Sequence, residues 1–184
     1  MILNENNVVY CDANFLIAYF VKNPQEPDLQ KQAKVLFAQM LVAKCKIMIS
    51  PLAFDECWNG IRKAVGPKKI TQHIRFAIDN LLKRTPFKLR NGGATQYSYS
   101  EIINDLADFT ENILNHKNFE IVQLIDSKKG VINALDKLNV LKPRDAFHLI
   151  MALDNGSSHM VTNDGKLKTE AEKSGITCLG LDKS

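Results

Sequence analysis

The sequence predicts an α/β fold, with a mostly parallel central sheet and helices on both of its faces. Short β-rich runs alternate along the chain with longer segments in which apolar residues recur at helical spacing. Strands that alternate with helices are joined by crossover connections, which pair them in parallel. The chain has 184 residues, of which 45% are hydrophobic, so it can bury the core of one domain. We therefore predict a single domain over residues 1–184.

Local signals place the elements of the first part of the chain. The expected order is a strand at 8–11, helices at 14–20 and 29–44, a strand at 46–49 and a helix that starts at Ser50. A hydroxyl residue such as Ser50 suits the N-cap, and Pro51 suits the first helical position. This part therefore contains two strand–helix units.

A helical insertion is expected from about 66 to 117, after the chain break at Gly66 and Pro67. It contains an amphipathic helix at 68–84 and a helix that Ser100 caps. The elements expected after the insertion are a strand at 119–124, a helix from Asp126 to about 138, a helix at 144–153 begun by Pro143, a strand at 159–162, a short helix closed by Gly175 and a strand at 176–179.

Four acidic residues are expected at the carboxyl edge of the sheet, where ligands bind in open parallel sheets. Asp12 directly follows the first strand, and Asp164 follows the strand at 159–162. Glu56 and Asp145 lie in the early turns of helices that leave the same edge. Each acid alone has a structural explanation, such as a helix cap, a turn or a solvated position. Together they repel one another, and a bound divalent cation would neutralise the cluster.

The cysteines and histidines argue against other kinds of metal site. The four cysteines form no C-x-x-C pair, so we expect reduced packing residues rather than disulfides or zinc ligands. The four histidines show no ligand spacing either. A bound metal would therefore have oxygen ligands, which favours Mg²⁺ or Mn²⁺.

Other polar residues near the four acids have simpler interpretations. Asp55 points about 100° away from Glu56 around its helix, so Glu56 is the preferred ligand. Asp154 lies at the far end of the helix that carries Asp145, and we expect it at the surface. His148 lies one turn after Asp145 and could approach the acids, although a core or surface position is favoured.

Positive charge is concentrated in one segment, which we call the basic block. The net charge is +4, but residues 62–90 contain nine Lys or Arg and one acid. A run of positive charges alone favours a solvated helix face. A polyanionic partner would explain why the basic block is so positive while the rest of the chain is net negative. The side chains expected to contact RNA phosphates are Lys68, Lys69, Arg75, Lys83 and Arg84.

Two cellular locations are disfavoured by the sequence. The longest apolar runs are too short to span a bilayer. The N-terminus has neither a basic cluster nor a long apolar stretch, as a secretory signal would. We therefore expect a cytoplasmic protein without membrane attachment.

Several segments resemble the motifs of the PIN-domain ribonuclease family. The first motif, an acid and then Asn after strand one, is similar to YCDANFLI, and the second, a Ser-led helix with a Glu, is similar to ISPLAFDEC. The third and fourth motifs together resemble PRDAFHLIMALDNGSSHMVTNDGKL. The likeness covers roughly residues 8–60 and 119–180. The segment from about 61 to 118 is longer than in the compact VapC-like toxins of this family, so that branch and a related PIN nuclease both stay open.

The resemblance implies a metal-dependent ribonuclease that acts on single-stranded or structured RNA. The implied ligands of Mg²⁺ or Mn²⁺ are Asp12, Glu56, Asp145 and Asp164. Asn14 and Thr162 would orient these ligands by hydrogen bonds. A toxin would also bind an antitoxin that covers the acids, and a homodimer is another candidate assembly.

Two other functions agree with only part of the sequence pattern. A phosphatase of the haloacid dehalogenase type also has an Asp after strand one, but it needs a second Asp two residues later, where this chain has Asn14. A non-catalytic RNA-binding PIN module would have lost part of its site, and the presence of all four acids argues against that loss.

Overall fold

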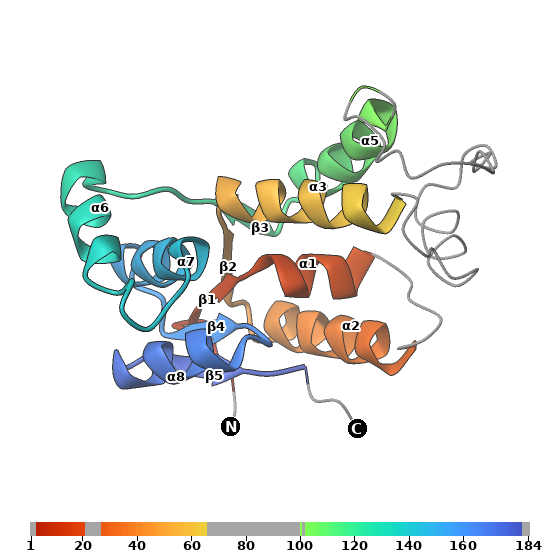
Figure 1. Ribbon diagram of the computed structural model, residues 1–184. Helices are drawn as coiled ribbons and strands as arrows, with labels where there is room; N and C mark the ends of the chain where they lie inside the picture. The colour runs from red at the N-terminus through yellow and green to blue at the C-terminus, as the bar shows by residue number, and fades with distance from the viewer. Residues whose placement is uncertain (1–2, 21–26, 66–99, 101, 182–184) are drawn as a thin grey trace.

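The computed structural model describes residues 3–20, 27–65, 100 and 102–181, and it contains five parallel strands with helices on both sides of the sheet (Figure 1). The elements before residue 66 are β1 (Val8–Cys11), α1 (Ala13–Phe20), α2 (Pro27–Val42), β2 (Lys46–Ile49) and α3 (Pro51–Val65). The later elements are α5 (Ile103–Leu114), β3 (Phe119–Ile121), α6 (Ser127–Leu135), α7 (Pro143–Asp154), β4 (His159–Val161), α8 (Gly165–Lys173) and β5 (Thr177–Leu179).

The strands lie in the order β3-β2-β1-β4-β5, and every neighbouring pair is parallel. The first strand of the chain is therefore the central strand of the sheet. Its two neighbours come from distant parts of the sequence, since β2 begins at Lys46 and β4 begins at His159. This arrangement confirms the predicted fold class, a parallel central sheet with helices on both faces.

The sheet separates two hydrophobic cores because the side chains of a strand alternate between its two faces. Val9 and Cys11 of β1 belong to a core that includes residues of α1, α2, α3 and α5. Tyr10 belongs to a second core, formed with residues of α6, α7 and α8. Figure 1 shows the same division, with α6 and α7 on one side of the strands and α1 and α2 on the other. Tyr10 therefore faces α7.

The expected elements occur in the expected order within the described residues, but some boundaries differ. β3 ends at Ile121 and α6 ends at Leu135, each earlier than the sequence suggested. The capping role expected for Ser100 is wrong, because the N-cap of α5 is Ile102, which makes no side-chain capping bond. Ile102 is almost fully buried, so apolar packing rather than a polar cap fixes this helix start. The amphipathic helix expected at 68–84 lies outside the described residues.

The described part of the chain contains no helix with the length and apolarity that a membrane crossing requires. The four cysteines are free thiols, as expected, with Cys11 and Cys57 in the core.

Candidate active site

The strand order identifies one edge of the sheet at which a ligand would be expected. From β1 the chain adds β2 and β3 on one side and then returns to add β4 and β5 on the other. In open α/β sheets, ligands bind beyond the carboxyl ends of the strands at the point where the order reverses. That point lies here between β1 and β4. Cys11 pairs with Val161, so the residues that follow them, Asp12 and Thr162, both lie at this edge.

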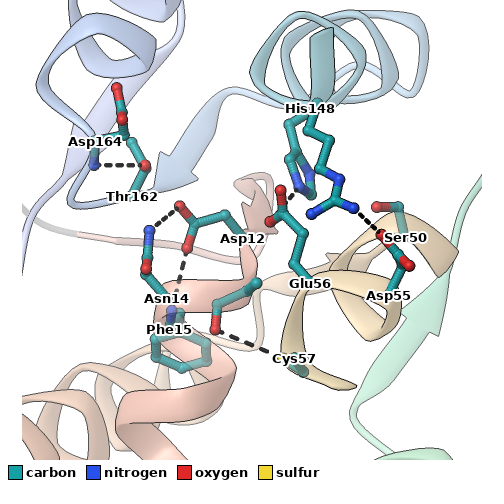
Figure 2. A network of polar contacts seen from close by, with 12 residues as sticks. Asp12, Asn14, Phe15, Ser50, Asp55, Glu56, Cys57, His148, Thr162 and Asp164 are labelled. Atoms are coloured by element: carbon teal, nitrogen blue, oxygen red, sulfur yellow. Dashed lines mark hydrogen bonds and ion pairs between the residues drawn. The ribbon is translucent and has the colours of Figure 1, made fainter. Parts of the chain in front are cut away.

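Asp12 is a buried carboxylate held by several hydrogen bonds. Its side chain is 3% exposed, Oδ1 accepts from the Phe15 N–H at 3.1 Å, and Oδ2 accepts from Asn14 Nδ2 at 3.2 Å (Figure 2). Burial raises the pKa of Asp12 above its usual value, while hydrogen bonds, first among them that from Thr162, oppose the rise. Burial of a carboxylate is costly unless a partner compensates its charge. None of the ion pairs between described residues includes Asp12.

Asp164 is the N-cap of α8. Its Oδ1 accepts from the backbone N–H groups of Lys166 and Leu167 at 2.9 and 3.0 Å, and its own N–H donates to Thr162 Oγ1 at 3.1 Å. Taken alone, this acid was expected to form a turn with Gly165, and the structure instead gives it a helix-capping role. It does not exclude a second role, since the capping bonds use only one of the two carboxylate oxygens.

Asp145 lies in the first turn of α7 and is partly buried. Burial raises its pKa above the usual value, the negative charge of Asp164 raises it further, and that of Glu56 adds to the effect. The positive charge of Lys142 opposes the rise. Asp145 on α7 therefore lies close enough to Asp164 and to Glu56 for their negative charges to disfavour its ionised form.

Glu56 on α3 contacts a histidine of α7. His148 Nε2 lies 3.1 Å from Glu56 Oε2, and the histidine side chain is 1% exposed. His148 therefore lies in the core, as favoured from the sequence, and also reaches the acids. The contact with Glu56 was not predicted, although the position of His148 one turn after Asp145 was the signal that could have indicated it.

Asp55 makes an ion pair with Arg144 Nη2 at 2.9 Å and does not join the four acids (Figure 2). Its side chain points away from Glu56, as the helical geometry predicted. Asp154 is the last residue of α7, at the opposite end of this helix from Asp145. A surface groove between α2 and residues 180–181 contains none of the four acids among its lining residues.

The four acids have the right chemistry for a divalent cation, but they are not arranged around one point. All of them supply carboxylate oxygens, which are the ligands of Mg²⁺ and Mn²⁺. The buried carboxylate of Asp12, which forms no ion pair with another described residue, also fits a cation nearby. Across the described residues, however, no three Asp, Glu, His or Cys side chains are grouped to hold a metal ion. Coordination by three of the acids therefore requires rotation of the more exposed side chains.

The RNA-contacting side chains expected in the basic block all lie outside the described residues. These are Lys68, Lys69, Arg75, Lys83 and Arg84. Their role stays a prediction, as do the ligand roles of the four acids and the orienting roles of Asn14 and Thr162.

Comparison with known proteins identifies the family. Residues 9–173 match the family model of the PIN domain. The match covers most of the chain, which therefore belongs to the PIN domain family, whose members are generally nucleases. Among solved structures, the chain is similar to one in the structure of FitAB bound to an IR36 DNA fragment, with 9% sequence identity, a TM-score of 0.48 and 95% of each chain covered. A comparison with curated proteins gave no match.

Proposed function

We propose that this chain is a metal-dependent endoribonuclease that hydrolyses RNA phosphodiester bonds. The observation that carries the proposal is the buried carboxylate of Asp12, at the edge where β1 and β4 end. The interacting acids Asp145, Asp164 and Glu56 supply further carboxylates from three separate elements. Membership of the PIN domain family supports nuclease chemistry.

In this proposal the four acids hold Mg²⁺ or Mn²⁺. Asp12 is the most rigid ligand, because Phe15 and Asn14 fix both of its oxygens. Thr162 accepts from the Asp164 N–H and also bonds Asp12, so it couples the ends of β1 and β4. When bound, the cation would lower the pKa of a water molecule and stabilise charge on the phosphate during in-line attack.

RNA is proposed as the substrate on two grounds that come from the sequence. The motifs resemble those of PIN-domain ribonucleases, and the basic block would attract a polyanion. A homodimer and a cognate antitoxin are proposed partners on the same resemblance. Co-purification of a small protein encoded beside this chain, with loss of cleavage in the complex, would support the antitoxin.

The proposal is tested by cleavage of a labelled single-stranded RNA, with DNA of the same sequence for comparison. Cleavage of RNA should require Mg²⁺ or Mn²⁺ and stop in excess chelator. Asp12→Asn should be inactive, because asparagine keeps the side-chain volume and loses the charge. Asp154→Asn is the matched control and should cleave normally, since Asp154 lies at the other end of α7 from Asp145. Undiminished cleavage in chelator would contradict the metal mechanism.

A second candidate function is a non-catalytic RNA-binding PIN module. The observation that favours it is the absence of a preformed group of three metal ligands among the described residues. This function would be supported if the protein bound RNA but did not cleave it. The result should hold with either Mg²⁺ or Mn²⁺ and for a range of RNA sequences. The phosphatase alternative has no support from the family assignment.

A further inference from the structure

A buried series of polar side chains leads from the core to Glu56. The Tyr10 hydroxyl lies 2.6 Å from Ser50 Oγ and 2.7 Å from His148 Nδ1. His148 Nε2 in turn lies 3.1 Å from Glu56 Oε2. Tyr10, Ser50 and His148 are almost fully buried. Figure 2 shows the Glu56 carboxylate turned toward the His148 ring.

The chemistry of these groups indicates which of them donates the hydrogen bond between His148 and Glu56. An ionised carboxylate can only accept hydrogen bonds, so His148 Nε2 must be the donor. Nδ1 then bonds to the Tyr10 hydroxyl, which can donate or accept. Both ring nitrogens of His148 are therefore engaged in polar contacts.

The orientation of the His148 ring is set by residues of two neighbouring strands of the sheet. Tyr10 comes from β1, Ser50 comes from the end of β2, and His148 comes from α7. The rings of Tyr10 and His148 also meet edge to face, with centroids 5.7 Å apart and an interplanar angle of 68°. Because these contacts leave His148 little freedom to rotate, its Nε2–H is presented to Glu56 in a fixed direction.

Ser50 has a different function in this series from the one that its sequence position suggests. It directly precedes α3, where a hydroxyl would be expected to cap the helix. Its hydroxyl instead bonds Tyr10. The start of the helix that carries Glu56 is thus tied to the same buried tyrosine that orients His148.

We infer that His148 is a positioning residue which, together with Tyr10 and Ser50, holds the Glu56 carboxylate toward the other acids. Without this contact, the partly exposed side chain of Glu56 would be free to turn into solvent. The contact occupies only Oε2, so Oε1 is available to a cation. The inference rests on the proposed function, because it concerns a ligand of the proposed metal site.

The alternative is that the contact between Glu56 and His148 only stabilises the packing of α3 against α7. Loss of the contact would then lower the stability of the protein but would leave the cation affinity of the folded protein unchanged. Cation affinity therefore separates positioning from a purely structural role.

The experiment measures Mn²⁺ affinity by calorimetry on the full-length chain and on variants shown to be folded. His148→Leu removes both polar contacts, and its affinity should fall roughly 10–100-fold, as is typical when a partner of a ligand is lost. His148→Gln should keep more affinity than His148→Leu, because its amide N–H can still donate to Glu56. Tyr10→Phe should weaken binding by less than His148→Leu, because it removes only the hydroxyl that orients the ring.

His159→Gln is the matched control. His159 is also buried and its Nδ1 also contacts a hydroxyl, Ser158 Oγ at 2.8 Å, but it begins β4 at the opposite edge of the sheet. Its substitution should leave the Mn²⁺ affinity unchanged.

A second measurement does not depend on a bound metal. In ¹⁵N NMR spectra of the metal-free protein, His148 Nε2 should carry a proton, and its resonance should shift in both Glu56→Gln and Tyr10→Phe. If Glu56→Gln left this resonance unchanged, the contact would be absent in solution and the inference would be overturned.

The outcomes distinguish this inference from the proposed function. If the wild-type protein binds Mn²⁺ and cuts RNA, but folded His148→Leu binds Mn²⁺ as tightly, positioning is overturned and the function stands. If the wild-type protein neither binds Mn²⁺ nor cuts RNA, the proposed function fails. In that case the NMR comparison still decides whether His148 holds Glu56.

Discussion

Asp164 is both the N-cap of α8 and a proposed metal ligand, and two substitutions separate these roles. Asp164→Asn keeps an acceptor oxygen for the N–H groups of Lys166 and Leu167 but removes the negative charge. Asp164→Ala removes the acceptor and the charge together. Since Asn and Asp are about equally good N-caps, only the alanine variant should weaken α8.

The expected magnitudes follow from the capping bonds and the neighbouring charges. Loss of an N-cap costs about 1 kcal/mol, which lowers Tm by about 2–4 °C in a domain of this size. Asp164→Asn should change Tm by less. It loses a favourable charge at a helix N-terminus, about 0.3–1 kcal/mol, but it also relieves the repulsion that raises the pKa of Asp145. Mg²⁺ at about 100 times its Kd would stabilise the wild type by about 2.7 kcal/mol, and both variants should lose most of this gain.

Thermal melts with and without Mg²⁺ provide the assay, and Asp126→Ala provides the control. Asp126 caps α6 by accepting from the Lys129 N–H at 3.0 Å, and it is not one of the four acids. Its alanine variant should lose about 1 kcal/mol of stability but should keep the full Mg²⁺ shift. If Asp164→Asn also kept the wild-type shift, Asp164 would be only a cap, and the reasoning from the acid cluster would be refuted for this residue.

Three further predictions concern other parts of the site. Metal-free Asp145→Asn should have a melting temperature at or above that of the wild type. The gain in the free energy of unfolding should be about 1 kcal/mol or less, because the site is partly solvated. Since the folded state raises the pKa of Asp145, the metal-free wild type should gain stability as pH falls from neutral through that raised pKa, and the variant should gain less in the same melts. Neutralising the basic block should weaken RNA binding and flatten its salt dependence by about one unit of slope per lost phosphate contact, and an unchanged slope would indicate a solvated face. Asp55→Asn should cleave RNA normally, and loss of its exposed ion pair should lower the free energy of unfolding by less than about 1 kcal/mol. Glu56→Gln should lose RNA cleavage. The opposite result would mean that Asp55, and not Glu56, is the metal ligand.

Local sequence signals predicted the order of the elements because such signals depend on neighbouring residues. Proline at the first position of α7 and Asp126 before α6 marked helix starts that the structure confirms. The prediction failed at α5, where the buried Ile102 takes the N-cap position instead of the polar Ser100. A hydroxyl marks a helix start only when tertiary packing does not fix that start elsewhere.

Local sequence signals also predicted some features of the candidate site and not others. The positions of Asp12 and Asp164 just after strands were visible in the sequence, since a strand end is a local feature. The hydrogen bonds that Asp12 accepts from Phe15 and Asn14 are also local, because these residues are at most three positions away. The contact between Glu56 and His148 joins residues 92 positions apart, and no local signal specifies such a pair.

By itself, the sequence predicted a parallel α/β architecture, and it predicted four acids that follow strands or lie in the early turns of helices at one edge of the sheet. These properties follow from hydrophobic periodicity and from the residues that end strands and begin helices. The tertiary structure alone decided that β1 lies between β2 and β4, and that Tyr10 meets a histidine 138 residues away. The physical reason is that strand order and side-chain partners depend on how whole elements pack across the sheet, and packing is a property of the folded chain rather than of any segment.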